Sequence, residues 1–224
     1  MPDASAIPWA RSTILQQRPN PTMSSRQSIL NKLRQNLPPA MELPSLEEDW
    51  LQYPDPLAQF SEVLTGVGGQ CVSVPTLADV QRHLEELNTY QAAAQRVSAV
   101  PGIEATFDFH AVDDPHAVEH VDYAVLPGEL AVAENAAVWV DDSNVRHRVL
   151  FFITQHLALV VPRSGLVHNM HEAYDRVNVT RRPFGAFISG PSKTADIEQS
   201  LVIGAHGARS LTVFLVDDLA TNFE

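Results

Sequence analysis

The stretch that decides the fold is residues 184–207, which read FGAFISGPSKTADIEQSLVIGAHG. Its apolar start, Phe184 to Ile188, predicts a buried strand, and the small and polar residues 189–193 predict a tight loop. A helix is predicted to follow, and residues 211–216 predict another buried strand. Strand, loop, helix and strand within about thirty residues predict a βαβ unit, whose two strands are parallel and whose crossover is right-handed.

The predicted helix of this unit has signals at both ends. It is expected to begin near Thr194, because either Ser192 or Thr194 can cap the first turn. Asp196 and Glu198 then lie where the positive end of the helix dipole favours acids. Gly207 is placed to end the helix in a left-handed conformation.

The rest of the chain alternates predicted strands and helices, which indicates an α/β fold. Amphipathic helices are predicted for 55–68 and for a longer segment that Thr76 opens. The predicted strands are 70–74, 97–100, 121–126, 129–140 and 156–161. Pro127-Gly128 separates the third strand from the fourth.

The N-terminal part divides into a tail and a helical extension. Residues 1–22 are rich in Pro, Gln and Ser and are expected to be a flexible tail. Residues 23–53 predict an amphipathic helix followed by a proline-rich linker. The α/β domain is then expected to span residues 54–224.

Charge excludes several classes of partner. The net charge of −12 argues against nucleic acid or an anionic membrane surface. The charge is unevenly spread: residues 97–145 contain ten acids and no Lys or Arg, whereas residues 146–224 contain eight basic and seven acidic residues. The C-terminal third can therefore receive an anion that the middle of the chain would repel.

Cysteine content and hydropathy indicate the cellular compartment in which the protein is expected. Cys71 is the only cysteine, so this chain can build neither a disulfide framework nor an iron–sulfur cluster. The apolar runs are too short to span a bilayer, and residues 1–22 lack the apolar core of a secretory signal. We therefore expect a cytoplasmic protein.

Two segments resemble the signature of the LUD domain family. They are SGPSKTADIE at 189–198 and GAHG at 204–207, and the similarity extends back to Met23. Within the family, the chain is most similar to the lactate-utilisation protein C branch. The resemblance implies the parallel-rich sheet of CoA transferases and ribose-phosphate isomerase-like enzymes, flanked by helices. It also implies a role in oxidising L-lactate to pyruvate, with iron–sulfur proteins as partners.

The loop at 189–194 is the first candidate site. Backbone N–H groups and polar side chains at a helix N-terminus suit a phosphate or carboxylate. Its expected ligand is a small anionic metabolite, and the plainer alternative is a helix cap with a solvated lysine. This is no P-loop, because Pro191-Ser192 separates the glycine from Lys193 and proline donates no N–H. The predicted anion-binding residues are Ser189, Gly190, Ser192, Lys193, Thr194 and His206.

Glu134 is the candidate catalytic residue. It lies in Ala133-Glu-Asn-Ala-Ala-Val138, where related sequences carry an acid beside small residues, within a predicted half-buried strand. A carboxylate there can act as a general base or accept a substrate hydroxyl. The alternative is a structural ion pair with Arg148 or Arg209.

The histidines have structural alternatives to chemistry. His206 belongs to the family motif, but at a helix end it can simply satisfy the last carbonyls. His116 and His120 are four residues apart among carboxylates, yet a metal site needs converging ligands, so a solvated surface is the better interpretation. Neither a metal nor a resident cofactor is predicted for this chain.

Three functional hypotheses remain open from the sequence. The resemblance favours an accessory or substrate-handling component of lactate oxidation. A stand-alone transferase or isomerase, acting on a phosphorylated or CoA-linked metabolite, is consistent with the related fold alone. A ligand-sensing module without catalysis is the third.

The first testable prediction concerns the tail. Because residues 1–22 show no periodic pattern and the resemblance begins at Met23, removing them should leave the melting temperature of the chain unchanged. A loss of about 1 kcal/mol would lower it by roughly 2–4 °C in a domain of this size, which calorimetry resolves. A larger drop would contradict the assignment of these residues as a tail.

Overall fold

The computed structural model describes residues 24–46, 48–179, 183–194 and 202–219. The chain divides into two units, residues 1–48 and 49–224. In the first unit, α1 (Ser25–Gln35) begins after Ser24, whose hydroxyl accepts a hydrogen bond from the N–H of Gln27. No residue of α1 is buried, so its apolar face is not packed within its own unit.

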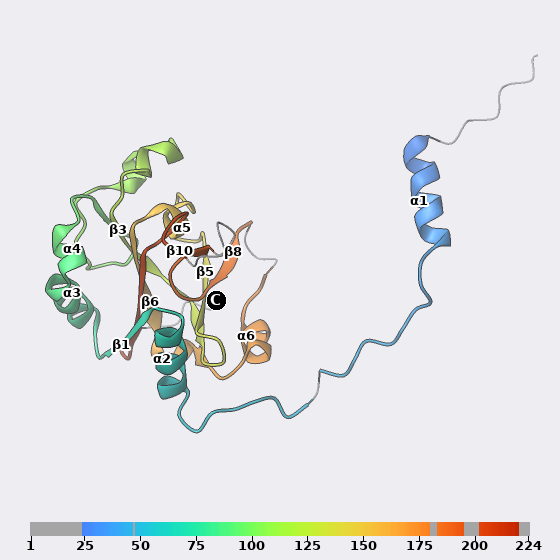
Figure 1. Ribbon diagram of the computed structural model, residues 1–224, viewed down its shortest axis with the longest axis horizontal. Helices are drawn as coiled ribbons and strands as arrows, with labels where there is room; N and C mark the ends of the chain where they lie inside the picture. Colours follow the sequence, from blue (N-terminus) through green and yellow to red (C-terminus); the bar gives the residue numbers. More distant parts are fainter. Residues whose placement is uncertain (1–23, 47, 180–182, 195–201, 220–224) are drawn as a thin grey trace, which may run out of the picture. The chain divides into compact units, whose positions relative to one another are not determined.

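The second unit is built on a five-stranded, wholly parallel sheet in the order β1-β11-β6-β3-β2 (Figure 1). Its strands are β1 (Gln70–Val74), β2 (Arg96–Ser98), β3 (Tyr123–Pro127), β6 (His156–Pro162) and β11 (Ser210–Val216). Six of the seven residues of β6 are buried, as are six of the seven of β11. Near-continuous apolar strands of this kind are typical of a parallel sheet covered on both faces.

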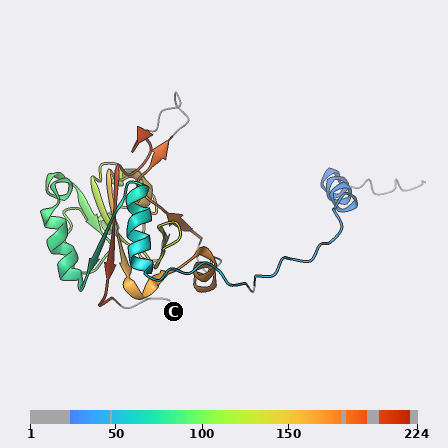
Figure 2. The same ribbon diagram turned by 60° about the horizontal axis from the view of Figure 1, so that its bottom comes forward.

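Helices cover both faces of this sheet, and Figure 2 shows α3 to one side and α2 to the other. The helices of the second unit are α2 (Pro56–Gly66), α3 (Leu77–Glu86), α4 (Asn88–Ala92), α5 (Leu150–Ile153) and α6 (Met170–Arg176). Short 3-10 turns lie at Phe109–Ala111, Pro115–Val118 and Arg163–Gly165. No helix in the described ranges is both long enough and apolar enough to cross a membrane.

Alternation along the strands divides the core into two layers. Leu157, Leu159 and Val161 of β6 pack in the cluster that contains Phe60 and Leu64 of α2. The intervening residues of β6 pack with α3 and α4 through the opposite cluster. Successive side chains of a strand point to opposite faces, so one apolar strand supplies both layers.

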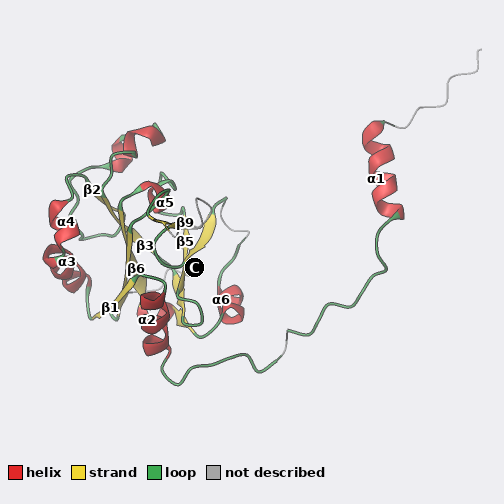
Figure 3. Cartoon of the chain, in the orientation of Figure 1, coloured by secondary structure: helices red, strands yellow, loops and turns green. Residues whose placement is uncertain are grey.

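A smaller sheet packs over the α2 face and is itself covered by α6. Its order is β7-β4-β5-β8, in which β4 pairs antiparallel with β5, β5 antiparallel with β8, and β4 parallel with β7. Its strands are β4 (Leu130–Val132), β5 (Ala137–Asp141), β7 (Leu166–Val167) and β8 (Gly185–Ile188). Figure 3 shows both sheets among the helices, which confirms the α/β class predicted from the sequence.

The predicted βαβ unit at residues 184–216 is wrong. β8 pairs with β5 of the small sheet, whereas β11 lies between β1 and β6 of the large one. The two strands differ in burial: β8 is half-buried at the edge of its sheet, whereas the interior strand β11 is buried on both faces. A short apolar run does not distinguish these environments.

The predicted helix after the loop is also wrong where the structure describes it. Lys193–Thr194 forms β9, which pairs antiparallel with β10 (Val202–Ile203). The predicted first turn falls on residues 195–201, outside the described ranges. Antiparallel pairing therefore replaces the expected N-terminal turn at Thr194, and β-branched side chains at three of the four paired positions favour strands.

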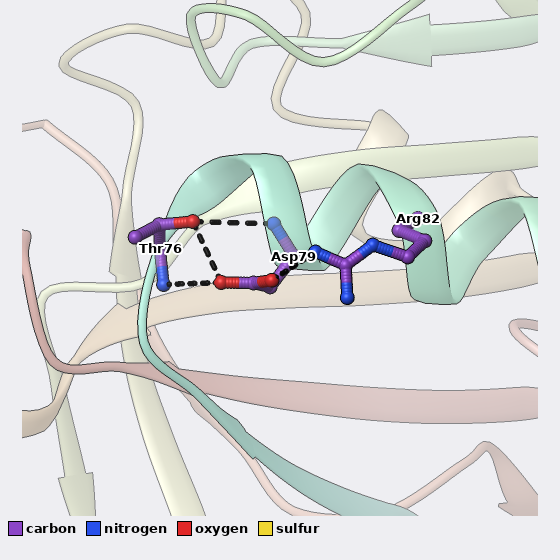
Figure 4. A network of polar contacts seen from close by, with 3 residues as sticks. All are labelled: Thr76, Asp79 and Arg82. Carbon is purple, nitrogen blue, oxygen red and sulfur yellow. Dashed lines mark hydrogen bonds and ion pairs between the residues drawn. The ribbon is translucent and has the colours of Figure 1, made fainter.

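Helix α3 begins with a capping box, drawn in Figure 4. The hydroxyl oxygen of Thr76 accepts from the N–H of Asp79 at 3.3 Å, and the Asp79 carboxylate accepts from the N–H of Thr76 at 3.1 Å. The Thr76 hydroxyl also donates to the Asp79 carboxylate, which forms an ion pair with Arg82. This reciprocal pairing satisfies two backbone donors that the first turn would otherwise leave free.

The second prediction tests this cap. Thr76→Ala should destabilise the chain by about 0.5–2 kcal/mol, because the N-cap acceptor is lost. The hydrogen bond from Thr76 is the main cause that lowers the pKa of Asp79 below its ordinary value of 3.8. The stabilisation that this hydrogen bond gives to the fold is therefore present above pH 3.8 and is lost as the pH falls through the lowered pKa of Asp79.

Urea unfolding at pH 7 and in acid measures both effects. The gap between wild type and Thr76→Ala should shrink in acid. Thr65→Ala is the matched control, since Thr65 lies within α2 and its hydroxyl donates only to the carbonyl of Ser61. Equal stability of Thr76→Ala and wild type at pH 7 would refute the role of the cap.

Candidate functional site

The motif loop is held in place by the end of α2. Gly190 has φ +75°, and a Cβ at this position would lie 2.9 Å from the carbonyl oxygen of Val67. Both the left-handed backbone and this close approach require glycine. Pro191 lies next to Gly68 on the same helix end. The loop is thus fixed by residues far from it in sequence.

A hollow of about 260 Å³ gathers four of the predicted anion-binding residues, namely Ser189, Gly190, Ser192 and His206. Aromatic and apolar side chains complete its wall, from Phe151, Phe152, Leu157, Phe187, Ile188 and Leu211. Lys193 and Thr194 do not line it, but they continue directly from Ser192 in β9. The structure therefore brings the two parts of the sequence motif to one place.

The backbone of this loop offers fewer donors than a helix N-terminus would. The N–H of Ser192 donates to the carbonyl of Ala208 at 2.8 Å, and Pro191 has no N–H. The hydroxyl of Ser189 donates to the carbonyl of Asn135 at 2.7 Å. An anion in this hollow would therefore have to be held by side chains, chiefly those of Ser192, Lys193 and His206.

Glu134 has a different setting from the one predicted. It is exposed, in the turn between β4 and β5, and not in a half-buried strand. Its carboxylate accepts a hydrogen bond from the N–H of Met170 at 3.0 Å, at the first residue of α6. No ion pair joins it to Arg148 or Arg209 among the described residues. Its visible role is to tether α6 to the small sheet.

The histidine pairs have structural partners. His116 and His120 are exposed, and each interacts with a neighbouring acid, Asp114 and Glu119 respectively. The Asp114 carboxylate raises the pKa of His116. Within the described part of the chain, no group of three or more His, Cys, Asp or Glu side chains is arranged to hold a metal.

Two further histidines hold the segment that precedes α2. The ring nitrogen Nδ1 of His168 accepts from the N–H of Tyr53 at 3.0 Å. His171 stacks on Trp50 with ring centroids 3.5 Å apart. Asn169, between them, donates to the carbonyl of Leu51 at 2.9 Å. These side chains attach the segment to α6.

The sequence interpretation missed a larger pocket of about 670 Å³ at the carboxyl ends of β2, β3 and β6. Ligands of α/β sheets commonly bind at such an edge. Three carboxylates line it, those of Glu129, Asp141 and Asp142, together with Arg146, which forms an ion pair with Asp113. The polar residues that follow a strand at Asp141-Asp142-Ser143-Asn144 were the available sequence signal.

Comparison with known proteins agrees with this architecture. Residues 115–216 match the LUD domain. The match covers a little under half of the chain. The matched range runs from the turn before β3 to the end of β11, so it includes three strands of the large sheet and both segments of the motif.

Curated relatives of this chain share one name. Lactate utilization protein C of an Exiguobacterium species is 32% identical over 136 residues, which cover 56% of this chain and 59% of the relative. The protein of the same name from Shouchella clausii is 33% identical over 105 residues, covering 45% and 46%. The chain thus spans about half the length of the curated relatives it matches.

A solved structure shares the fold. The crystal structure of a DUF162 family protein from Deinococcus radiodurans superposes with a TM-score of 0.53 at 19% sequence identity. The superposition covers 72% of this chain and 96% of that one. At this identity the likeness concerns the fold alone.

The third prediction separates tethering from catalysis at Glu134. Glu134→Ala should destabilise the chain by about 0.5–1.5 kcal/mol, because the Met170 N–H loses its acceptor. Glu134→Gln keeps an acceptor oxygen and should melt close to wild type. Thermal unfolding measures both, with Glu62→Ala, an exposed carboxylate of α2, as control. Wild-type stability of Glu134→Ala would contradict the tethering role.

Proposed function

We propose that this chain serves L-lactate utilisation, as an accessory or substrate-handling component that acts together with iron–sulfur partner proteins. The observation that carries the proposal is its similarity to several proteins named lactate utilization protein C. The single cysteine supports the need for partner proteins, since one thiol cannot hold an iron–sulfur cluster and the clusters must then be held by other chains.

The proposed ligand site is the hollow at Ser189–Ser192 and His206, extended by Lys193 and Thr194. Its volume of about 260 Å³ lies just below the usual range for ligand pockets, so it suits a small metabolite. The lysine and the serine hydroxyl can bind a carboxylate, and the aromatic wall can contact a short apolar chain. A small acid such as lactate or pyruvate combines both groups.

A transferase acting on a phosphorylated or CoA-linked metabolite is less well supported. A pocket large enough for such a ligand lies at the carboxyl edge of the sheet, where Glu129, Asp141 and Asp142 line it. Carboxylates repel phosphate groups, and Arg146 is already paired with Asp113. The charge of that pocket therefore disfavours this alternative.

The fourth prediction uses the fact that the chain has only two lysines, Lys32 and Lys193. After reductive methylation with ¹³C-formaldehyde, each lysine gives its own NMR signal. Titration with L-lactate or pyruvate should shift the Lys193 signal and leave that of Lys32 unchanged. Lys193→Ala should weaken binding by about 1–3 kcal/mol, the range for a charge-assisted hydrogen bond, and should barely change stability.

Lys32→Ala is the matched control and should bind as wild type does. In the source organism, deletion of the gene should abolish growth on L-lactate and spare growth on pyruvate, and the Lys193→Ala gene should restore growth poorly. Growth on lactate without the gene would refute the proposed role. Lactate oxidation by the isolated, metal-free chain would refute its accessory nature.

A further inference from the structure

A second polar hollow, of about 370 Å³, lies at the opposite edge of the large sheet from the carboxylate-lined pocket. The strands β3, β6 and β11 all begin there, after or at Asp122, His156 and Arg209. Asn88 and Thr89 of α4 form another side of it. Nothing in the sequence motif indicated this place, because its residues come from four separate elements.

This hollow is distinct from the motif hollow, although neighbouring residues line the two. Leu157 lines the motif hollow, whereas its neighbour His156 lines this one. Likewise, Ala208 lines the motif hollow and Arg209 lines this one. Successive residues of a strand point to opposite faces of a sheet. The two hollows therefore lie on opposite faces of the same amino-terminal edge.

Arg209 supplies a positive charge to the hollow. Its backbone N–H donates to the carbonyl of Gln155 at 2.8 Å, and its side-chain stem packs against Gly204, where a Cβ would lie 2.3 Å from Cγ of the arginine. Its guanidinium has no ion pair or hydrogen bond with any other described residue. A fixed stem with an uncommitted guanidinium is suited to binding an oxyanion through two parallel hydrogen bonds.

His156 is held beside this arginine. Its Nδ1 lies 2.8 Å from the hydroxyl of Ser210, and its ring stacks on Tyr123 with centroids 5.8 Å apart. Burial lowers the pKa of His156, and the positive charge of Arg209 lowers it further, whereas Asp122 acts in the opposite direction. The residues that α4 contributes carry no charge.

Asp122 is the one acid that lines the hollow, and one of its two carboxylate oxygens already accepts hydrogen bonds. Its Oδ2 accepts hydrogen bonds from the N–H groups of Ala94 and Gln95, both at 2.9 Å. Its Oδ1 has no partner among the described residues. That oxygen repels a bare anion but can accept a hydrogen bond from a hydroxyl group.

We propose that this hollow binds a small hydroxy-carboxylate, with Arg209 binding the carboxylate, His156 donating to it, and Asp122 accepting from the hydroxyl. The hollow suits a small ligand that carries both an acid and a hydroxyl, because a cation and a hydrogen-bond acceptor line the same space. The proposal concerns a site separate from the lactate-handling loop and stands whether or not the chain serves lactate utilisation.

Binding of an anion beside the imidazole favours the protonated ring, so that the affinity rises as the pH falls. The ordinary pKa of 6.5 is lowered in the free protein, and the bound carboxylate raises it. The dissociation constant should therefore decrease between pH 8 and pH 6. His156→Gln should remove this dependence, since glutamine does not titrate.

The test is titration of the full chain with glycolate, acetate and inorganic phosphate, followed by the histidine ring signals in ¹H–¹⁵N spectra and by calorimetry. Glycolate should shift the ring signals of His156 and bind more tightly than acetate, which lacks the hydroxyl. Arg209→Gln should weaken glycolate binding at least about tenfold. Arg209→Lys keeps the charge without the fork and should lie between Arg209→Gln and wild type. Lys32→Ala, in α1, should leave the shift of the His156 ring signals unchanged.

Several results would overturn the proposal. It fails if no carboxylate shifts His156, if Arg209→Gln binds glycolate as wild type does, or if phosphate binds and glycolate does not. Equal affinity for glycolate and acetate would show that Asp122 makes no contact with the ligand hydroxyl. Melting curves check that Arg209→Gln is folded. If it is not folded, the pH dependence of the glycolate dissociation constant is compared between wild type and His156→Gln, and an equal dependence in both overturns the proposal.

Discussion

The structure depends on the parallel pairing of β6 with β11, the two central strands that are buried on both faces. A parallel sheet exposes neither face to water, so each must be covered by other elements. The helices α3 and α4 cover one face; α2 and the small sheet cover the other. Side chains of α5 and of the turns at Phe109–Ala111 and Pro115–Val118 also pack in the layer beside α2.

The same pairing decides where polar side chains can gather. Along the buried length of β6 and β11, all but one of the side chains are apolar, so functional groups are confined to the strand ends. At the amino-terminal edge, alternation sends His156 to one face and Leu157 to the other. Two hollows of different chemistry result, one aromatic beside the motif loop and one polar beside Arg209.

The two edges of the sheet differ in their balance of charge. Three carboxylates and Arg146 line the pocket at the carboxyl edge, whereas Asp122 and Arg209 line the hollow at the amino edge. The large pocket is therefore the more acidic of the two and the less suited to an anion. Its three carboxylates come from the stretch 97–145, in which the sequence has ten acids and no Lys or Arg.

The sequence by itself determined the α/β class, the bounds of β1 and the start of α3 at Thr76, because these depend on local patterns and hydrogen bonds. It also identified the motif segments 189–198 and 204–207, and four of the residues that line one hollow. It could not determine which sheet β8 joins, because a short apolar run fits an edge as well as an interior strand.

Only the tertiary structure decided that Thr194 lies in a strand paired with β10, and that Glu134 tethers α6 through a partner distant in sequence. The large pocket and the Arg209 hollow are likewise formed by strand ends that only folding brings together. Local energies specify the elements, whereas burial of their faces against one another specifies the sites.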